Sequence, residues 1–71
     1  MWFMMLLGRL GMNLKALREQ RGLSQTELAR RIRMTQPYIA MLERGAFTNP
    51  SLDVLRKLAK ALKVRISELV D

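Results

Sequence analysis

Apolar residues recur at helical spacing along most of the chain, in short runs divided by polar caps and glycines. Leu14 and Leu17 follow Asn13, and Gly22 comes a few residues later. Apolar residues three or four positions apart share one face of a helix, and a glycine directly after such a run commonly ends it. The pattern therefore predicts a first helix that Asn13 caps and Gly22 ends.

The next apolar run opens with a capping box. Ser24 and Glu27 have the spacing at which the serine oxygen accepts from the glutamate amide while the glutamate side chain reaches back. Leu23 and Leu28 flank this cap as a hydrophobic staple. The second helix should then bury one stripe of side chains: Leu28, Ala29 and Ile32.

A proline near the start of the third run marks a beginning. Thr35 is a suitable N-cap. Pro37 then falls in the first helical turn, where a missing amide costs little. Met34 and Ile39 repeat the staple spacing, and Gly45 follows as a stop. We predict a third helix over about 36–44.

Two further helices complete the pattern. Ser51 caps a fourth helix, and a short fifth turn covers about Ile66 to Val70. The fourth helix should turn these residues inward: Leu52, Leu55, Leu58, Ala59 and Leu62. β-Branched residues never alternate with polar ones over a useful length, so no strand is expected. The fold class predicted is all-α, a compact bundle of about five short helices.

The first eleven residues, MWFMMLLGRLG, differ from the rest. The apolar run Met1 to Leu7 is far short of the ~20 residues that span a bilayer, and it lacks the flanks of a signal peptide. Gly8 and Gly11 separate it from the helical pattern, so we predict an extension at 1–11 and a domain at 12–71. The extension is either a disordered segment or an apolar arm that packs on a partner subunit.

Composition excludes several kinds of chemistry. The chain has 71 residues, enough for one domain, and it contains neither cysteine nor histidine. Disulfides, thiolate metal sites and the commonest general base are therefore absent. The sequence also has no glycine-rich phosphate loop and no clustered carboxylates. We expect no enzyme activity, no cofactor and no metal.

Charge points to a polyanionic partner. Lys and Arg number 13 against six Asp and Glu, which gives a formal net charge of +7. Nucleic acid is the first candidate for so basic a domain. An anionic membrane surface is weaker, because Arg9 is the only cation near the apolar run. The charge runs themselves are typical of a solvated face: Arg30, Arg31 and Arg33, with Arg56, Lys57, Lys60 and Lys63.

Only the residues RMT separate the second and third predicted helices, so these must cross steeply, as in a helix-turn-helix unit. The stretch LSQTELARRIRMTQPYIAMLERG, continued by NPSLDVLRKLAKALKV, resembles the Cro/C1-type (XRE) helix-turn-helix domain. The resemblance runs from about Met12 to Val70. It rests on residues in order and at matching spacing: Ser24, Gln25, Leu28, Ala29, Ile39, Glu43, Gly45, Pro50, Ser51 and Leu52.

This resemblance implies a lambda-repressor-like fold whose third helix enters the major groove of double-stranded DNA. Gln36 has the paired donor and acceptor that match adenine. The other residues expected to contact bases are Thr35, Pro37, Tyr38 and Met41. Simpler interpretations stay open. Gln36 could be a solvated side chain, Tyr38 a partly exposed packing residue, and Met41 a residue that covers the edge of the core.

The resemblance also implies contacts that position the unit on DNA. Gln25, Arg44 and Ser24 are expected to contact phosphates. Arg18 and Glu43 match a pair that forms a largely buried ion pair in related domains. The main departure is Arg33, which stands where the family usually has glycine; if φ is positive there, arginine costs roughly 1 kcal/mol.

The leading hypothesis is a cytoplasmic, bacterial or phage transcriptional regulator that binds a specific DNA sequence as a homodimer and acts as a repressor. Dimer contacts are expected from the last helix (Ile66, Leu69 and Val70), from the loop around Phe47 or from the apolar arm. The alternative is an antitoxin-type module that holds a protein partner, such as a toxin, and also regulates its own promoter.

Overall fold

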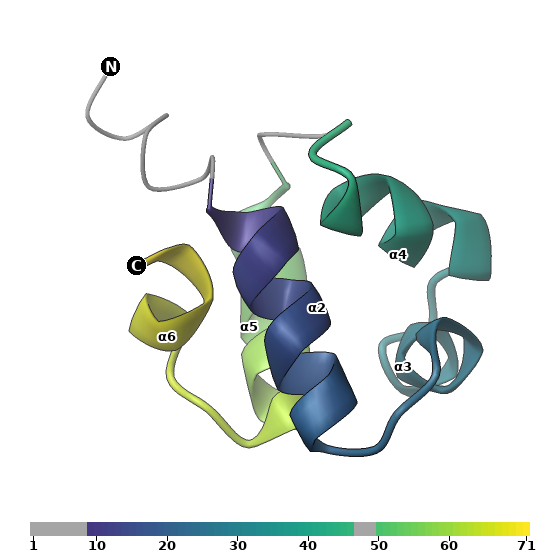
Figure 1. The fold of residues 1–71 in the computed structure, drawn as a ribbon, viewed down its shortest axis with the longest axis horizontal. Helices are drawn as coiled ribbons and strands as arrows, with labels where there is room; N and C mark the ends of the chain where they lie inside the picture. The colour runs from purple at the N-terminus through teal and green to yellow at the C-terminus, as the bar shows by residue number, and fades with distance from the viewer. Residues whose placement is uncertain (1–8, 47–49) are drawn as a thin grey trace.

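The computed structural model describes residues 9–46 and 50–71. These residues form five α-helices and no strand, which confirms the predicted all-α class (Figure 1). The helices are α2 (Leu10–Gln20), α3 (Gln25–Arg31), α4 (Gln36–Glu43), α5 (Leu52–Leu62) and α6 (Ile66–Val70). The apolar run at 1–7 and the loop at Phe47 lie outside the described residues.

The helices surround one small core. Figure 1 shows α3 nearly end-on while α4 lies across the view, so the predicted steep crossing of this pair is confirmed. α4 also packs on α2, and α6 packs on both α2 and α5. Every helix contributes at least one side chain that is less than 2% exposed: Leu10, Leu14, Leu28, Ile39, Leu42, Leu58, Leu62 and Leu69.

Two predictions about inward and outward positions are wrong. Leu52, expected inside, is 54% exposed because it is the first residue of α5 and precedes the buried stripe that starts at Leu55. Leu69, expected on a dimer surface, is completely buried in the core of the chain itself. It therefore has no area left to offer a second subunit.

The prediction that Asn13 caps the first helix is also wrong. α2 begins three residues earlier, at Leu10, and no side chain caps it. Asn13 instead donates its amide to the carbonyl oxygen of Leu69 at 2.9 Å. It therefore satisfies one of the carbonyls left unpaired at the end of α6.

Gly11 lies inside α2 and does not break it. A Cβ atom at this position would lie 2.5 Å from the carbonyl oxygen of Leu42 and 2.7 Å from that of Glu43. The backbone of α2 therefore rests directly on the last turn of α4. This contact fixes how closely the two helices approach.

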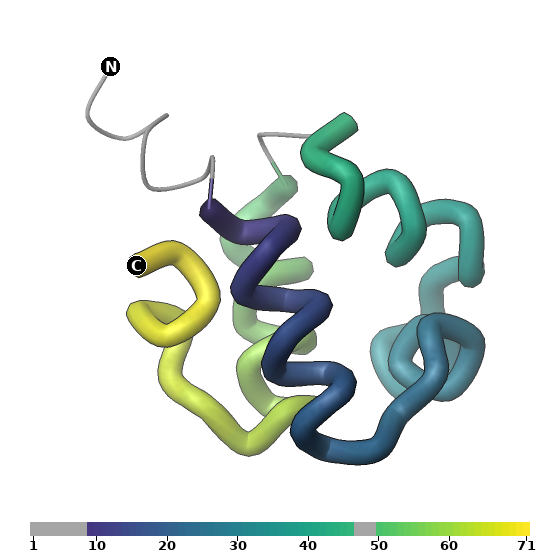
Figure 2. The backbone as a smooth tube through the Cα atoms, in the orientation of Figure 1, coloured from purple at the N-terminus to yellow at the C-terminus, as the bar shows by residue number. Residues whose placement is uncertain are grey.

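The residues that flank α2 also supply donors to other helix ends. Arg21 Nε donates to the carbonyl oxygen of Leu62 at 2.8 Å, at the end of α5. Arg9 Nη1 donates to the carbonyl oxygen of Asp71 at 3.0 Å. The backbone trace shows the result, with the C-terminal segment returning to the start of α2 (Figure 2).

The predicted caps of the later helices are confirmed. Ser24 and Glu27 form the capping box, and the N–H of Ser24 holds the pKa of the Glu27 carboxyl below its ordinary value. Thr35 accepts from the amide of Tyr38 at 3.3 Å, and Ser51 caps α5 in the same way. Polar residues three positions before an amide thus set where α3, α4 and α5 begin.

Two helices end on residues that are not glycine but adopt the left-handed conformation. Arg33, after α3, has φ of 59°, and Lys63, after α5, has φ of 58°. The Met34 amide donates back to the carbonyl of Ala29 at 2.9 Å, and the Val64 amide closes the same ring after α5. Such helix-ending rings favour glycine because a Cβ crowds the backbone there. Arg33 thus meets the condition under which arginine is expected to cost stability, a positive φ.

We predict that Arg33→Gly raises the free energy of unfolding by up to about 1 kcal/mol, because glycine adopts positive φ without strain. Urea denaturation followed by circular dichroism measures the change. Arg31→Gly is the matched control, since it removes the same side chain from a helical position and should destabilise by about 1 kcal/mol. A lower urea midpoint for Arg33→Gly would contradict the prediction.

We predict that Gly11→Ala lowers the free energy of unfolding by about 1–3 kcal/mol, because the added methyl group meets backbone that cannot yield easily. The loss should appear although alanine is the better helix former. Gly22→Ala separates strain from crowding, since Gly22 has φ of 68° and open space around it. Equal or higher stability of Gly11→Ala would show that α2 and α4 do not touch as described.

Candidate nucleic-acid interface

A buried ion pair joins α2 to the end of α4. Arg18 Nε lies 2.6 Å from Glu43 Oε2, and Arg18 Nη2 lies 3.1 Å from Glu43 Oε1. The side chains are only 10% and 4% exposed. The ion pair expected from the sequence is therefore present, and its geometry is bidentate.

Arg18 makes a third hydrogen bond in addition to the two with Glu43. Its Nη1 atom donates to the carbonyl oxygen of Leu23 at 2.6 Å, just before α3 begins. The hydrogen bond to Glu43 raises the pKa of Arg18 above its ordinary value, against the opposing effect of burial. The guanidinium thus holds α2, the start of α3 and the end of α4 together.

The hydrogen bonds continue from this pair to the surface. Gln25 Nε2 donates to Glu43 Oε1 at 2.9 Å, and Gln36 Nε2 donates to Gln25 Oε1 at 2.7 Å. A carboxylate can only accept, so the amide nitrogen of Gln25 must face Glu43 and its oxygen must face Gln36. The carbonyl oxygen and one N–H of Gln36 then remain for another partner.

These bonds bring the beginnings of α3 and α4 together. Gln25 is the first residue of α3, and Gln36 is the first residue of α4. Helix N-termini carry partial positive charge and unpaired amides, which suit anionic groups. We name this surface the polar edge and define it by four residues: Ser24, Gln25, Thr35 and Gln36.

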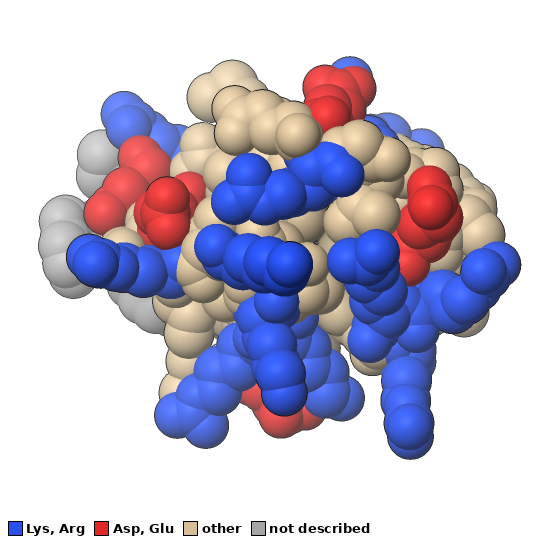
Figure 3. Space-filling model, turned by 90° about the horizontal axis from the view of Figure 1, so that it is seen from below, with Lys and Arg blue, Asp and Glu red and all other residues tan. Residues whose placement is uncertain are grey.

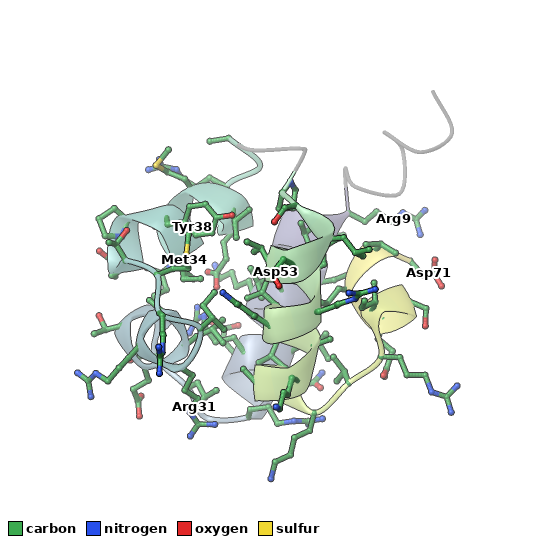
Figure 4. All side chains as sticks on the ribbon, turned by 180° about the vertical axis from the view of Figure 1, so that it is seen from behind. Arg9, Arg31, Met34, Tyr38, Asp53 and Asp71 are labelled. Carbon is green, nitrogen blue, oxygen red and sulfur yellow. The ribbon has the colours of Figure 1, made fainter. Side chains whose placement is uncertain are left out.

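The remaining predicted contact residues divide into two groups. Pro37 and Arg44 are exposed, at the start and just after the end of α4. Tyr38 and Met41 are half-buried. Figure 4 shows Tyr38 pointing toward α5, and burial raises the pKa of its phenol. Tyr38 packs against the core, which favours the packing interpretation of this residue.

Two other kinds of site are absent from the described part of the chain. Residues 9–46 and 50–71 contain no group of three or more acidic side chains placed to share a metal ion. None of their helices is long and apolar enough to cross a bilayer. The hydrogen-bonded series that ends at Gln36 is the candidate site.

Known proteins resemble this chain over most of its length. Residues 14–69 match the helix-turn-helix family. The immunity repressor protein of Bacillus phage phi105 is 38% identical over 60 residues, which cover 84% of this chain and 41% of the repressor. The transcriptional regulator SinR of Bacillus subtilis is 34% identical over 62 residues, covering 87% of this chain and 56% of SinR. The chain thus spans about half the length of these relatives.

Solved structures match the fold closely. SinR in complex with DNA, described as the master regulator for biofilm formation, superposes with a TM-score of 0.83 at 34% identity, covering 87% of this chain and 98% of that one. The restriction-modification controller protein C.AhdI from Aeromonas hydrophila gives 0.81 at 40% identity, covering 89% and 94%. The chain therefore belongs to the Cro/C1-type (XRE) helix-turn-helix family, with α3 and α4 as its helix-turn-helix pair.

Proposed function

We propose that this chain is a sequence-specific DNA-binding transcriptional regulator that inserts α4 into the major groove. The observation that carries the proposal is the hydrogen-bonded series from Arg18 through Glu43 and Gln25 to Gln36. It ties an exposed amide, at the start of the second helix of the pair, to a buried ion pair. A side chain held in this way can distinguish bases at low entropic cost.

The free groups of Gln36 match adenine. Its carbonyl oxygen can accept from adenine N6, and its second N–H can donate to N7. Neither contact requires the bond to Gln25 to break, because that bond uses only one of the two amide hydrogens. Thr35, Pro37 and Met41 complete the proposed set of base-contacting residues, with Pro37 and Met41 limited to apolar contact. Tyr38, also expected to contact bases, packs against the core instead.

Phosphates would position the unit on either side of Gln36. Gln25 keeps one N–H, and Ser24 and Arg44 are exposed near the two ends of the helix pair. Contacts to phosphates fix the register of a domain on DNA without specifying its sequence. This supports Gln25, Ser24 and Arg44 as the phosphate-contacting residues of the proposal.

The regulatory role and the homodimer are part of the same proposal. The named relatives include a phage immunity repressor and a regulator solved with DNA, which favours cytoplasmic repression over an antitoxin role. Ile66 and Val70 remain partly exposed on α6 and are available for a dimer contact, whereas Leu69 is not. Two copies would place two α4 helices about one turn of DNA apart.

We predict that selection from a random pool of DNA duplexes enriches a palindrome with half-sites about 10 base pairs apart, as expected of a symmetric dimer. The bound sequences are identified after several rounds at physiological salt. An enriched asymmetric motif would contradict the symmetric dimer but would agree with sequence-specific DNA binding. Binding that is salt-sensitive and enriches no motif would contradict the proposed function.

We predict that Gln36→Ala removes a preference for adenine at one position of each half-site, worth about 1–3 kcal/mol. Competition between selected and singly substituted duplexes measures this preference. Gln25→Ala should weaken the same preference less, because Gln36 loses its support but keeps its groups. Both residues lie at the surface end of the network, so thermal unfolding should change little, which serves as the control. An unchanged base preference in Gln36→Ala would exclude Gln36 from base contact.

A further inference from the structure

A second charged surface lies away from the polar edge. It is a cleft of about 430 Å³, which we name the basic cleft, and its lining consists of Arg31, Ile32, Arg33, Lys57, Lys60, Ala61 and Lys63. All five ionisable side chains of the lining are cationic. The two apolar residues, Ile32 and Ala61, form the uncharged part of its wall.

The basic cleft lies between the C-terminal end of α3 and the second half of α5. Figure 4 shows Arg31 at the end of α3, beside the lower part of α5. Gln25 starts the same helix, so six residues, or about 9 Å of helix, separate the polar edge from the cleft. Lys and Arg side chains gather through the middle and lower part of the face in Figure 3. A ligand in the cleft would therefore contact the end of α3 that is opposite to the polar edge.

Backbone strain falls on this same cleft. The two described residues that adopt positive φ without being glycine are Arg33 and Lys63, and both line it. Glycine at either position would be less strained. The chain instead has a cationic residue at each position. These residues lower the stability of the fold and repel each other. The arrangement is explained if an anion binds between them.

The remaining charges of the cleft are available to such a ligand. Lys57 has one acidic partner, Asp53, at 3.3 Å, and these side chains are 46% and 75% exposed. Ion pairs so exposed contribute little and exchange readily. An incoming anion can therefore compete with Asp53 for Lys57.

The chemistry of the lining indicates the class of anion. Arg and Lys side chains offer only donors, and no lining side chain offers an acceptor. Base edges and sugar hydroxyls are recognised through both donors and acceptors, so the cleft suits repeated negative charge without further features. The phosphodiester backbone of nucleic acid has this character, and contacts with it are independent of sequence.

We propose that the basic cleft binds the phosphate backbone of a second DNA duplex, so that one protomer bridges two duplexes. Binding of DNA in the cleft does not depend on the proposed function of α4. Bridging between an operator and a second duplex rests on the proposed function of α4. The consequence is a regulator that holds its operator close to another DNA segment.

The first test uses the variant Arg33→Gly/Lys63→Gly, which removes two cations while relieving strain at both positions. It should unfold at a higher temperature than the parent and yet bind a random-sequence duplex more weakly. The slope of log affinity against log salt should fall by about 1.8, since each phosphate contact contributes about 0.9. Arg30→Gln/Arg56→Gln is the control, because it removes two exposed cations outside the cleft. Equal losses in both variants would assign the effect to net charge and overturn the proposal.

The second test measures bridging by energy transfer between two duplexes, one labelled with a donor and one with an acceptor. The parent should give transfer, and Arg33→Gly/Lys63→Gly should remove it while keeping the DNA motif enriched by selection. Gln36→Ala should lose the motif and keep the salt-dependent binding of random DNA, so failure of the two sites can be distinguished. Transfer that survives in the cleft variant would overturn the proposal. Stabilisation of the parent by inorganic tripolyphosphate, without any energy transfer, would assign the cleft to a small anion instead.

Discussion

The ion pair between Arg18 and Glu43 is the interaction on which the helix-turn-helix geometry depends. Each member makes three hydrogen bonds within the network, so neither charge is left uncompensated in its buried position. Loss of one partner from such a pair is far more damaging than the net contribution of the pair suggests. The close approach at Gly11 acts at the same place, because it brings α2 against the carbonyl of Glu43. Charge and backbone contact together set the position of α4.

Stability and recognition share atoms in this arrangement. Glu43 accepts from Arg18 on the inside and from Gln25 on the outside, and Gln25 orients Gln36. An amide already held before DNA arrives loses less rotamer freedom on binding. The core of the domain thus extends, through two glutamines, to the surface proposed to contact bases.

The parts of the fold that depend on local spacing could be predicted from the sequence. Ser24, Thr35 and Ser51 cap amides only three residues away, and a spacing this short can be recognised in the sequence. The role predicted for Asn13 was wrong because its partner, Leu69, lies 56 residues further on. The role predicted for Gly11 was wrong for the same reason, since the α4 carbonyl oxygens that exclude a side chain there are distant in sequence. Long-range contacts of this kind leave no periodic signal.

The candidate site shows the same limit. The resemblance identified Arg18 and Glu43 as an ion pair and Gln25 and Gln36 as separate contact residues. The hydrogen bonds that join the two glutamines to each other and to Glu43 appear only in three dimensions. Helical spacing tells which face a glutamine occupies, and it does not tell what the amide binds. An exposed glutamine is equally suited to solvent until its neighbour on another helix is known.

The two ends of α3 follow opposite principles. At the Gln25 end, the network holds the two glutamines by hydrogen bonds, and the carbonyl oxygen and one N–H of Gln36 remain to make directional contacts. At Arg33 and beyond, cations accumulate in a cleft with little acid to neutralise them, at positions where the backbone itself favours glycine. Directional, satisfied groups discriminate between sequences, whereas clustered like charges attract any polyanion. A helix of seven residues therefore separates a surface suited to selectivity from one suited to unselective attraction.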